Sequence, residues 1–157
     1  MGSVKVERID HLGIVAGVIQ DLGVIEMIDI RIPPDEREDI TTGEAAAGVI
    51  INGLGFSHRP ISMTPQFFQS KALDILIREG ITPDMFNRFK LGRSLDKVFS
   101  YSCDMLFSEI ALSVCKQEGI DLRFNNLDTT SFSLTGEYVP DSDEHTILVT
   151  HGYSKDH

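Results

Sequence analysis

The chain has no tryptophan, only two cysteines, and 14 basic against 24 acidic side chains in 157 residues. Residues 1–120 carry 17 acidic and 12 basic side chains, and residues 121–157 carry 7 and 2, so the acidity is not confined to a tail. A formal net charge of −10 argues against a protein that binds nucleic acid through its overall charge. Any contact with DNA therefore has to use a local basic patch.

Disulfides and membrane segments are also missing from the pattern. Cys103 and Cys115 lie twelve residues apart in a segment with helical spacing, so about 18 Å separates them and they cannot pair with each other. The longest apolar run, residues 45–56, is shorter than the roughly 20 residues that cross a bilayer. No charged and then apolar leader opens the chain. We therefore expect a cytoplasmic protein with reduced, buried thiols and no membrane contact.

The first 119 residues have the pattern of an all-helical domain. Apolar residues recur at helical spacing from Leu12 to Ile30, and Gly23 predicts a break between two short helices. Thr41, followed three residues later by Glu44, forms a capping box that predicts a helix running to about residue 52. The sequence thus predicts three helices in its first third.

Further helical segments follow. Phe67 opens a predicted helix that ends at Gly80, and residues 91–118 fit one or two amphipathic helices that end at Gly119. Six phenylalanines are predicted as core and not as a base-stacking platform: Phe67, Phe68, Phe86, Phe89, Phe99 and Phe107.

Beyond Gly119 the apolar period changes toward two, which predicts strands. Turn residues around Pro140 separate the last predicted strand from the first two. The predicted fold class is therefore α+β, an all-helical domain in residues 1–119 followed by a three-stranded antiparallel meander in residues 120–157. Because an isolated meander is marginally stable, its sheet partners are expected beyond residue 157.

Asp128 lies inside this predicted β region. A charged aspartate in an apolar strand is normally retained only with a cation or a dense set of hydrogen bonds. The alternative is a strand-end aspartate that accepts hydrogen bonds from the backbone amides of Thr129 or Thr130. The residues alone leave both interpretations open.

Four ordered motifs resemble those of insertion-sequence transposases of the DDE class. They cover almost the whole chain, and as a set they are similar to the N-terminal portion of the bacterial or archaeal enzymes. The motifs are Asn52-Gly53-Leu54-Gly55-Phe56 with Arg59-Pro60, Leu91-Gly92-Arg93-Ser94-Leu95-Asp96, Leu127-Asp128-Thr129-Thr130-Ser131-Phe132 with Gly136-Glu137-Tyr138, and Gly152-Tyr153-Ser154-Lys155-Asp156-His157.

The resemblance implies that residues 1–119 are a helical N-terminal transposase domain and residues 120–157 the truncated start of a ribonuclease-H-like catalytic domain. It implies a catalytic and metal-binding role for Asp128, the first of three carboxylates. The family's chemistry needs all three around two Mg²⁺ or Mn²⁺ ions about 3.5–4 Å apart. With only the first carboxylate present, we expect this part to be catalytically incomplete and to bind neither ion tightly.

Transposon-end DNA is the partner that the resemblance implies for the full-length protein, and a homo-oligomer remains open. Arg88, Lys90, Arg93 and Lys97 form the only basic cluster, and one helix face bearing several of them can contact phosphates; a solvated helix face is the alternative. Two other functions also remain: a non-catalytic protein- or DNA-binding module, and a metal-dependent phosphohydrolase built from Asp128 with the carboxylates and histidines near the C-terminus.

Overall fold

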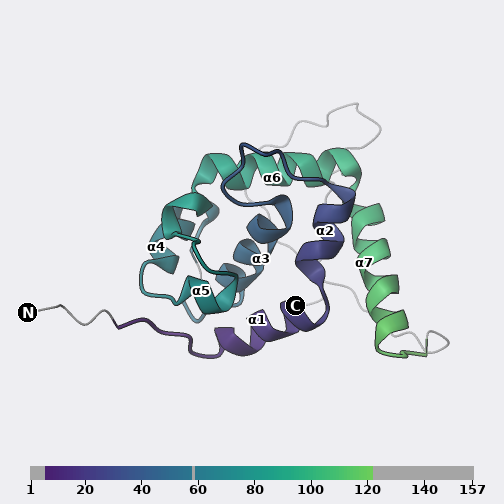
Figure 1. The fold of residues 1–157 in the computed structure, drawn as a ribbon, viewed down its shortest axis with the longest axis horizontal. Coiled ribbons are helices and arrows are strands. Elements are labelled where there is room, and N and C mark those ends of the chain that lie inside the picture. Colours follow the sequence, from purple (N-terminus) through teal and green to yellow (C-terminus); the bar gives the residue numbers. More distant parts are fainter. Residues whose placement is uncertain (1–5, 58, 122–157) are drawn as a thin grey trace, which may run out of the picture. The chain divides into compact units, whose positions relative to one another are not determined.

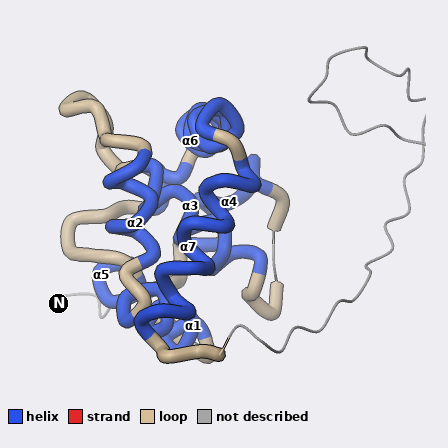
Figure 2. The backbone as a smooth tube through the Cα atoms, turned by 90° about the vertical axis from the view of Figure 1, so that its right-hand side faces the viewer, coloured by secondary structure: helices blue, strands red, loops and turns tan. Residues whose placement is uncertain are grey.

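The computed structural model describes residues 6–57 and 59–121, and within them the chain forms seven α-helices and two short 3-10 helices (Figure 1). This part is helix and loop throughout (Figure 2). By its internal contacts it belongs to one compact unit that ends at Asp121, called the helical unit below. Its elements are α1 (Leu12–Asp21), α2 (Val24–Arg31), α3 (Thr42–Gly53), η1 (Ile61–Met63), α4 (Thr64–Phe68), α5 (Leu73–Leu76), η2 (Pro83–Phe86), α6 (Arg88–Tyr101) and α7 (Cys103–Gln117).

The first two helices confirm the prediction for this segment. Gly23 separates α1 from α2 and has a φ of +65°, a left-handed conformation that glycine adopts without steric cost. α2 ends at Arg31, just before Pro33 and Pro34, which lack the backbone N–H that a continuing helix needs. The break and the end of this pair are therefore fixed by the residue types themselves.

α3 begins at the predicted capping box. The Thr41 hydroxyl accepts the backbone N–H of Glu44 at 3.0 Å, and the Glu44 carboxylate accepts the backbone N–H of Thr41 at 2.8 Å. Arg78, from the loop after α5, donates a further hydrogen bond to the same carboxylate. The cap thus fixes the start of α3 and also ties a distant loop to it.

The segment between residues 64 and 86 differs from the prediction. The sequence predicts one helix over residues 67–80, whereas α4 ends at Phe68 and α5 is a single turn. Between them the backbone pairs with the N-terminal segment: the N–H of Arg8 donates to the carbonyl of Ser70 at 2.8 Å, and the N–H of Ala72 donates to the carbonyl of Arg8 at 3.4 Å. A tertiary backbone pairing here replaces the helix that local periodicity favours.

α6 and α7 meet at Ser102 at an angle of 84°. Ser102 has a φ of +90°, which is uncommon for a residue other than glycine. Asn87 caps α6 by accepting the backbone N–H of Lys90 at 3.0 Å. The predicted amphipathic pair is confirmed, with its start at Arg88 instead of residue 91.

Two apolar clusters form the core of the helical unit. The larger one joins α1, α3, α4, α5 and α6 around the rings of Phe68 and Phe86, whose centroids lie 4.8 Å apart. The smaller one joins α2 to α7 through Ile28, Ile32 and Leu106. α7 accordingly runs beside α2 in Figure 1. α3 therefore lies in the larger cluster, and α7 covers the side of α2 that carries Ile28 and Ile32.

No single helix within residues 6–57 and 59–121 is long and apolar enough to cross a membrane. α6 and α7 reach that length and composition only when taken together, and they are bent by 84°.

The predicted α+β class is wrong. The described part of the chain contains helices, one isolated backbone bridge between Arg8 and Lys71, and no strand or sheet, so a three-stranded antiparallel meander is not present in it. The residues that carry the alternating pattern, 122–157, lie outside the described ones. An alternating pattern is not sufficient to establish a sheet, because a sheet also needs strands that pair with each other, and no such pair occurs in residues 6–57 and 59–121.

Candidate functional site

α6 carries all four side chains predicted to contact DNA. Lys90 and Lys97 are seven residues apart, so helical geometry places them on the same side. Lys90 is only 6% exposed. Arg93 is exposed and lies next to the two lysines, three residues after Lys90 and four before Lys97, whereas Arg88 is exposed on another side of the helix. The structure therefore divides the predicted basic cluster into an inward pair, Lys90 and Lys97, and an outward pair, Arg88 and Arg93.

The inward pair shares one acid from the loop between α2 and α3. Lys90 Nζ and Lys97 Nζ each lie 2.9 Å from Oε1 of Glu38, and the side chain of Glu38 is only 16% exposed. Lys97 donates a directed hydrogen bond, whereas the contact of Lys90 is an ion pair without one. These lysines hold the loop onto α6, and the Glu38 carboxylate offsets one of their two positive charges.

The pKa of Glu38 reflects this position. Burial alone would raise the pKa, but Lys97, Lys90 and the backbone N–H of Asp35 outweigh burial and lower it to about 2. Glu38 therefore carries a full negative charge under physiological conditions. Sequence reasoning missed Glu38 because it lies 59 residues before Lys97, in a loop with several other acids.

The outward pair has different surroundings. The guanidinium carbon of Arg88 lies 4.6 Å from the centre of the Phe89 ring, in a cation–π arrangement. Neither Arg88 nor Arg93 forms an ion pair within the described residues. Arg88 and Arg93 are therefore the two members of the predicted DNA-contacting cluster whose charges are exposed and not paired with a described acid.

Large apolar side chains are exposed on α6 and on α7. Phe89 is 62% exposed and Phe99 67% exposed on α6, and Phe107 is 74% exposed on α7. The prediction that six phenylalanines form the core is confirmed for Phe67, Phe68 and Phe86 and wrong for these three, because helical periodicity alone does not say which face meets the core.

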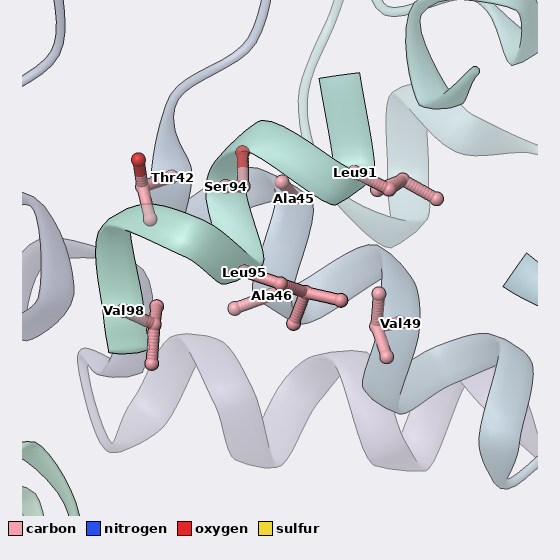
Figure 3. A pocket seen from close by; sticks show the side chains of 8 residues that line it. All are labelled: Thr42, Ala45, Ala46, Val49, Leu91, Ser94, Leu95 and Val98. Atoms are coloured by element: carbon pink, nitrogen blue, oxygen red, sulfur yellow. The ribbon is translucent and has the colours of Figure 1, made fainter. Parts of the chain in front are cut away.

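A small cavity lies between α3 and α6 (Figure 3). Its volume is about 20 Å³, which is room for one water molecule and not for a substrate. The hydroxyls of Thr42 and Ser94 are buried and have no hydrogen-bond partner among the described residues. The other lining residues are apolar: Ala45, Ala46, Val49, Leu91, Leu95 and Val98. This cavity therefore offers two orphan hydroxyls but no catalytic group.

The first of the four motifs has a structural role. Asn52 is 3% exposed, and its side-chain amide accepts the backbone N–H of Arg59 at 2.9 Å and donates to the Arg59 carbonyl at 2.7 Å. The same amide nitrogen lies 3.3 Å from the hydroxyl of Thr64. Asn52 thus closes the base of the loop that follows α3, in the way that one backbone peptide pairs with another.

The predicted catalytic residue and the predicted metal are not placed by this geometry. Asp128 lies outside the described residues. Within residues 6–57 and 59–121, no three His, Cys, Asp or Glu side chains come together in a group that could hold a metal ion. Cys103 and Cys115 are free thiols on one helix, as predicted, but Cys103 is exposed and Cys115 half-buried, so the predicted burial of both is wrong.

The chain belongs to the family described as a domain of unknown function, DUF4277, whose model matches residues 4–112. The match runs from before α1 into α7 and includes the first two of the four motifs. No curated protein and no solved structure matches the chain.

Proposed function

We propose that this chain is the N-terminal part of a transposase for DNA transposition and that its helical unit is a non-catalytic, protein-binding module. The transposase assignment is supported by the resemblance of the four ordered motifs. In the same proposal Asp128 is the first of the carboxylates that hold Mg²⁺ or Mn²⁺ in the full-length protein, and transposon-end DNA is the partner of that protein.

One observation carries the protein-binding role: α6 pairs both of its lysines with Glu38 and exposes two phenylalanines. Lys90 and Lys97 form ion pairs with Glu38, whereas Phe89 and Phe99 are more than 60% exposed. A surface that contacts DNA needs exposed cations, because affinity comes largely from phosphate neutralisation. Exposed aromatic side chains are instead typical of the central part of protein interfaces. The net charge of −10 also favours a protein partner over DNA, because it repels the phosphate backbone.

Movement of a reporter gene tests the transposase assignment. The reporter is flanked by the terminal repeats of the native locus, and the complete native reading frame is supplied in the same cells. We expect the reporter to move, and Asp128→Asn to abolish movement because a neutral amide binds Mg²⁺ weakly. Asp74→Asn, an exposed change on α5, is the matched control and should leave movement unchanged. A reporter that never moves with the unaltered frame would refute this assignment.

A gel-shift series with the terminal-repeat duplex separates protein binding from DNA binding by the helical unit. We expect the purified chain to give no salt-sensitive shift. A shift that disappears in the double variant Arg88→Glu with Arg93→Glu, but persists in the control Arg59→Glu, would replace the protein-binding role with DNA binding through α6.

A further inference from the structure

We propose that the outer face of α6 binds a second copy of this chain, packed antiparallel across a twofold axis. This inference rests on the proposed protein-binding role of the helical unit and names its partner. The surface is called the α6 face, and it consists of Phe89, Gly92, Arg93, Asp96 and Phe99.

The α6 face is a continuous strip along the helix. Phe89, Gly92, Asp96 and Phe99 are separated by three, four and three residues, the spacing that aligns side chains along a helix–helix seam. The residues that α6 buries, Lys90, Leu91 and Ser94, lie on the opposite side. α6 runs along the upper edge of the helical unit in both Figure 1 and Figure 2. The strip is therefore accessible within the helical unit.

Gly92 has no use inside the helical unit. A Cβ built at Gly92 would meet nothing within 4 Å, so no neighbour among the described residues requires a glycine there. A mid-helix glycine destabilises a helix relative to alanine. Small residues at a helix seam allow a second helix backbone to approach closely, which gives this position a role only when a partner is present.

The charges on the α6 face are self-complementary in one orientation. In an antiparallel pair centred between residues 94 and 95, Arg93 of each copy lies opposite Asp96 of the other, and neither residue forms an ion pair within the described part of its own chain. In that register Phe89 of one copy lies near the Phe99 end of the other. A parallel pair would instead place like charges opposite each other, so the charge order selects the antiparallel one.

Asp96 also argues for a second copy over nucleic acid. The carboxylate stands in the middle of the strip, where it would repel a phosphate backbone. In the antiparallel pair the same carboxylate faces Arg93, which forms no ion pair with the described residues of its own chain.

Sedimentation of the full 157-residue chain tests the α6 face. One helix per copy is a small contact, so we expect a monomer–dimer equilibrium between about 1 µM and about 1 mM protein. Arg93→Asp and Asp96→Arg place like charges opposite each other, and each alone should weaken dimerisation at least about tenfold. Gly92→Gln should weaken it as well, because the longer side chain separates the two helices.

Mixing the two charge variants supplies the decisive readout. In a mixed dimer Asp at position 93 of one copy faces Arg at position 96 of the other, so an equimolar mixture should dimerise although neither variant does so alone. Arg59→Asp, an exposed charge change in the loop after α3 and outside the α6 face, is the control and should leave dimerisation unchanged. Helical circular dichroism of each variant checks that it is folded.

Two results would overturn the proposal: a wild-type chain that stays monomeric over the whole range, or a dimer that both single charge variants leave intact. The reporter assay is independent of both. A dimer restored by mixing, together with a reporter that does not move, would retain the α6 face and remove the transposase assignment. Movement of the reporter with a monomeric chain would do the reverse.

Discussion

Thr42 and Thr64 are both fully buried, yet their hydroxyls have different surroundings. The Thr64 hydroxyl donates to the carbonyl of Ile61 at 2.9 Å and lies 3.3 Å from the amide nitrogen of Asn52, whereas the Thr42 hydroxyl has no partner in the part of the chain that the structure describes. We expect Thr64→Val to lower the free energy of unfolding by about 1–3 kcal/mol, because the groups that it served stay buried. Thr42→Val should be neutral or stabilising by up to about 1 kcal/mol.

Urea denaturation of the two valine variants measures this difference. Each substitution exchanges one hydroxyl for a methyl group of similar size, so each serves as the control for the other. Equal losses in both variants would show that the Thr42 hydroxyl has a partner in solution, such as a water molecule in the small cavity between α3 and α6.

Glu38 makes the stability of the folded chain depend on acid. Its pKa is about 2 in the folded state against an ordinary 4.5, so its contribution is complete above about pH 4.5 and is lost as the pH falls from 4.5 toward 2. We expect Glu38→Gln to destabilise the chain by about 2 kcal/mol at pH 7 and to flatten the stability profile in that window.

Unfolding midpoints recorded between pH 2 and pH 7 check this expectation. Glu36→Gln changes an exposed neighbour in the same loop and should retain the wild-type profile. A Glu38→Gln variant with an unchanged slope between pH 4.5 and pH 2 would mean that the lysine contacts do not persist in solution.

At the scale of the helices, we expect substitution by alanine to change the stability of the chain in opposite directions at two helical glycines, Gly48 and Gly92. A Cβ on Gly48 in α3 would lie 2.4 Å from Cε1 of Phe86, a buried ring, whereas one on Gly92 in α6 would meet nothing within 4 Å. Gly48→Ala should therefore destabilise the chain by about 1–3 kcal/mol through overpacking. Gly92→Ala should stabilise the chain by about 0.5–1 kcal/mol through helix propensity.

Thermal unfolding at low protein concentration measures both alanine variants without a contribution from self-association. Loss of stability in Gly92→Ala would indicate a neighbour for that position within the chain. That result would also remove the reason for assigning Gly92 to a contact with a second copy.

For the whole molecule, self-association should make the unfolding temperature depend on concentration. A dimer that binds only the folded state stabilises it by mass action, so the midpoint should rise as the wild-type chain is concentrated. Arg93→Asp should remove the dependence and leave the dilute midpoint nearly unchanged. Scanning calorimetry across the same concentration series tests both statements, and a midpoint that rises equally in Arg93→Asp would place the association elsewhere.

Sequence signals predicted the elements whose boundaries are written in local chemistry. Gly23, the Thr41 capping box and the prolines after α2 fix their own surroundings, and the structure agrees at each of them. The failures lie where distant residues decide. The turn between α4 and α5 pairs with Arg8, more than sixty positions away in the sequence, and no pattern within that segment predicts the pairing.

The DNA contact predicted for the basic cluster stays a prediction, but the separation of its residues in the fold has the same cause. Four basic residues on one predicted helix suggest one positive face, but Lys90 and Lys97 are turned toward an acid that becomes their neighbour only in the folded chain. The exposure of Phe89 and Phe99 could not be predicted, because their helical spacing fits a buried core equally well. The assignment of Asp128 depends on the resemblance and stays a prediction.

The small cluster of Ile28, Ile32 and Leu106 affects how the chain folds during its synthesis on the ribosome. α7 (Cys103–Gln117) contributes Leu106 to the cover of the side of α2 that carries Ile28 and Ile32, and the contacts between Arg31 and Glu109 and between Gln117 and the carbonyl of Asp21 also require this last helix. At about 5–20 residues per second, roughly 4 to 17 seconds separate the synthesis of Ile32 from that of Gln117. During that interval one side of the nascent α2 stays uncovered, so a chain that stalls before α7 exposes Ile28 and Ile32 to chaperones and proteases.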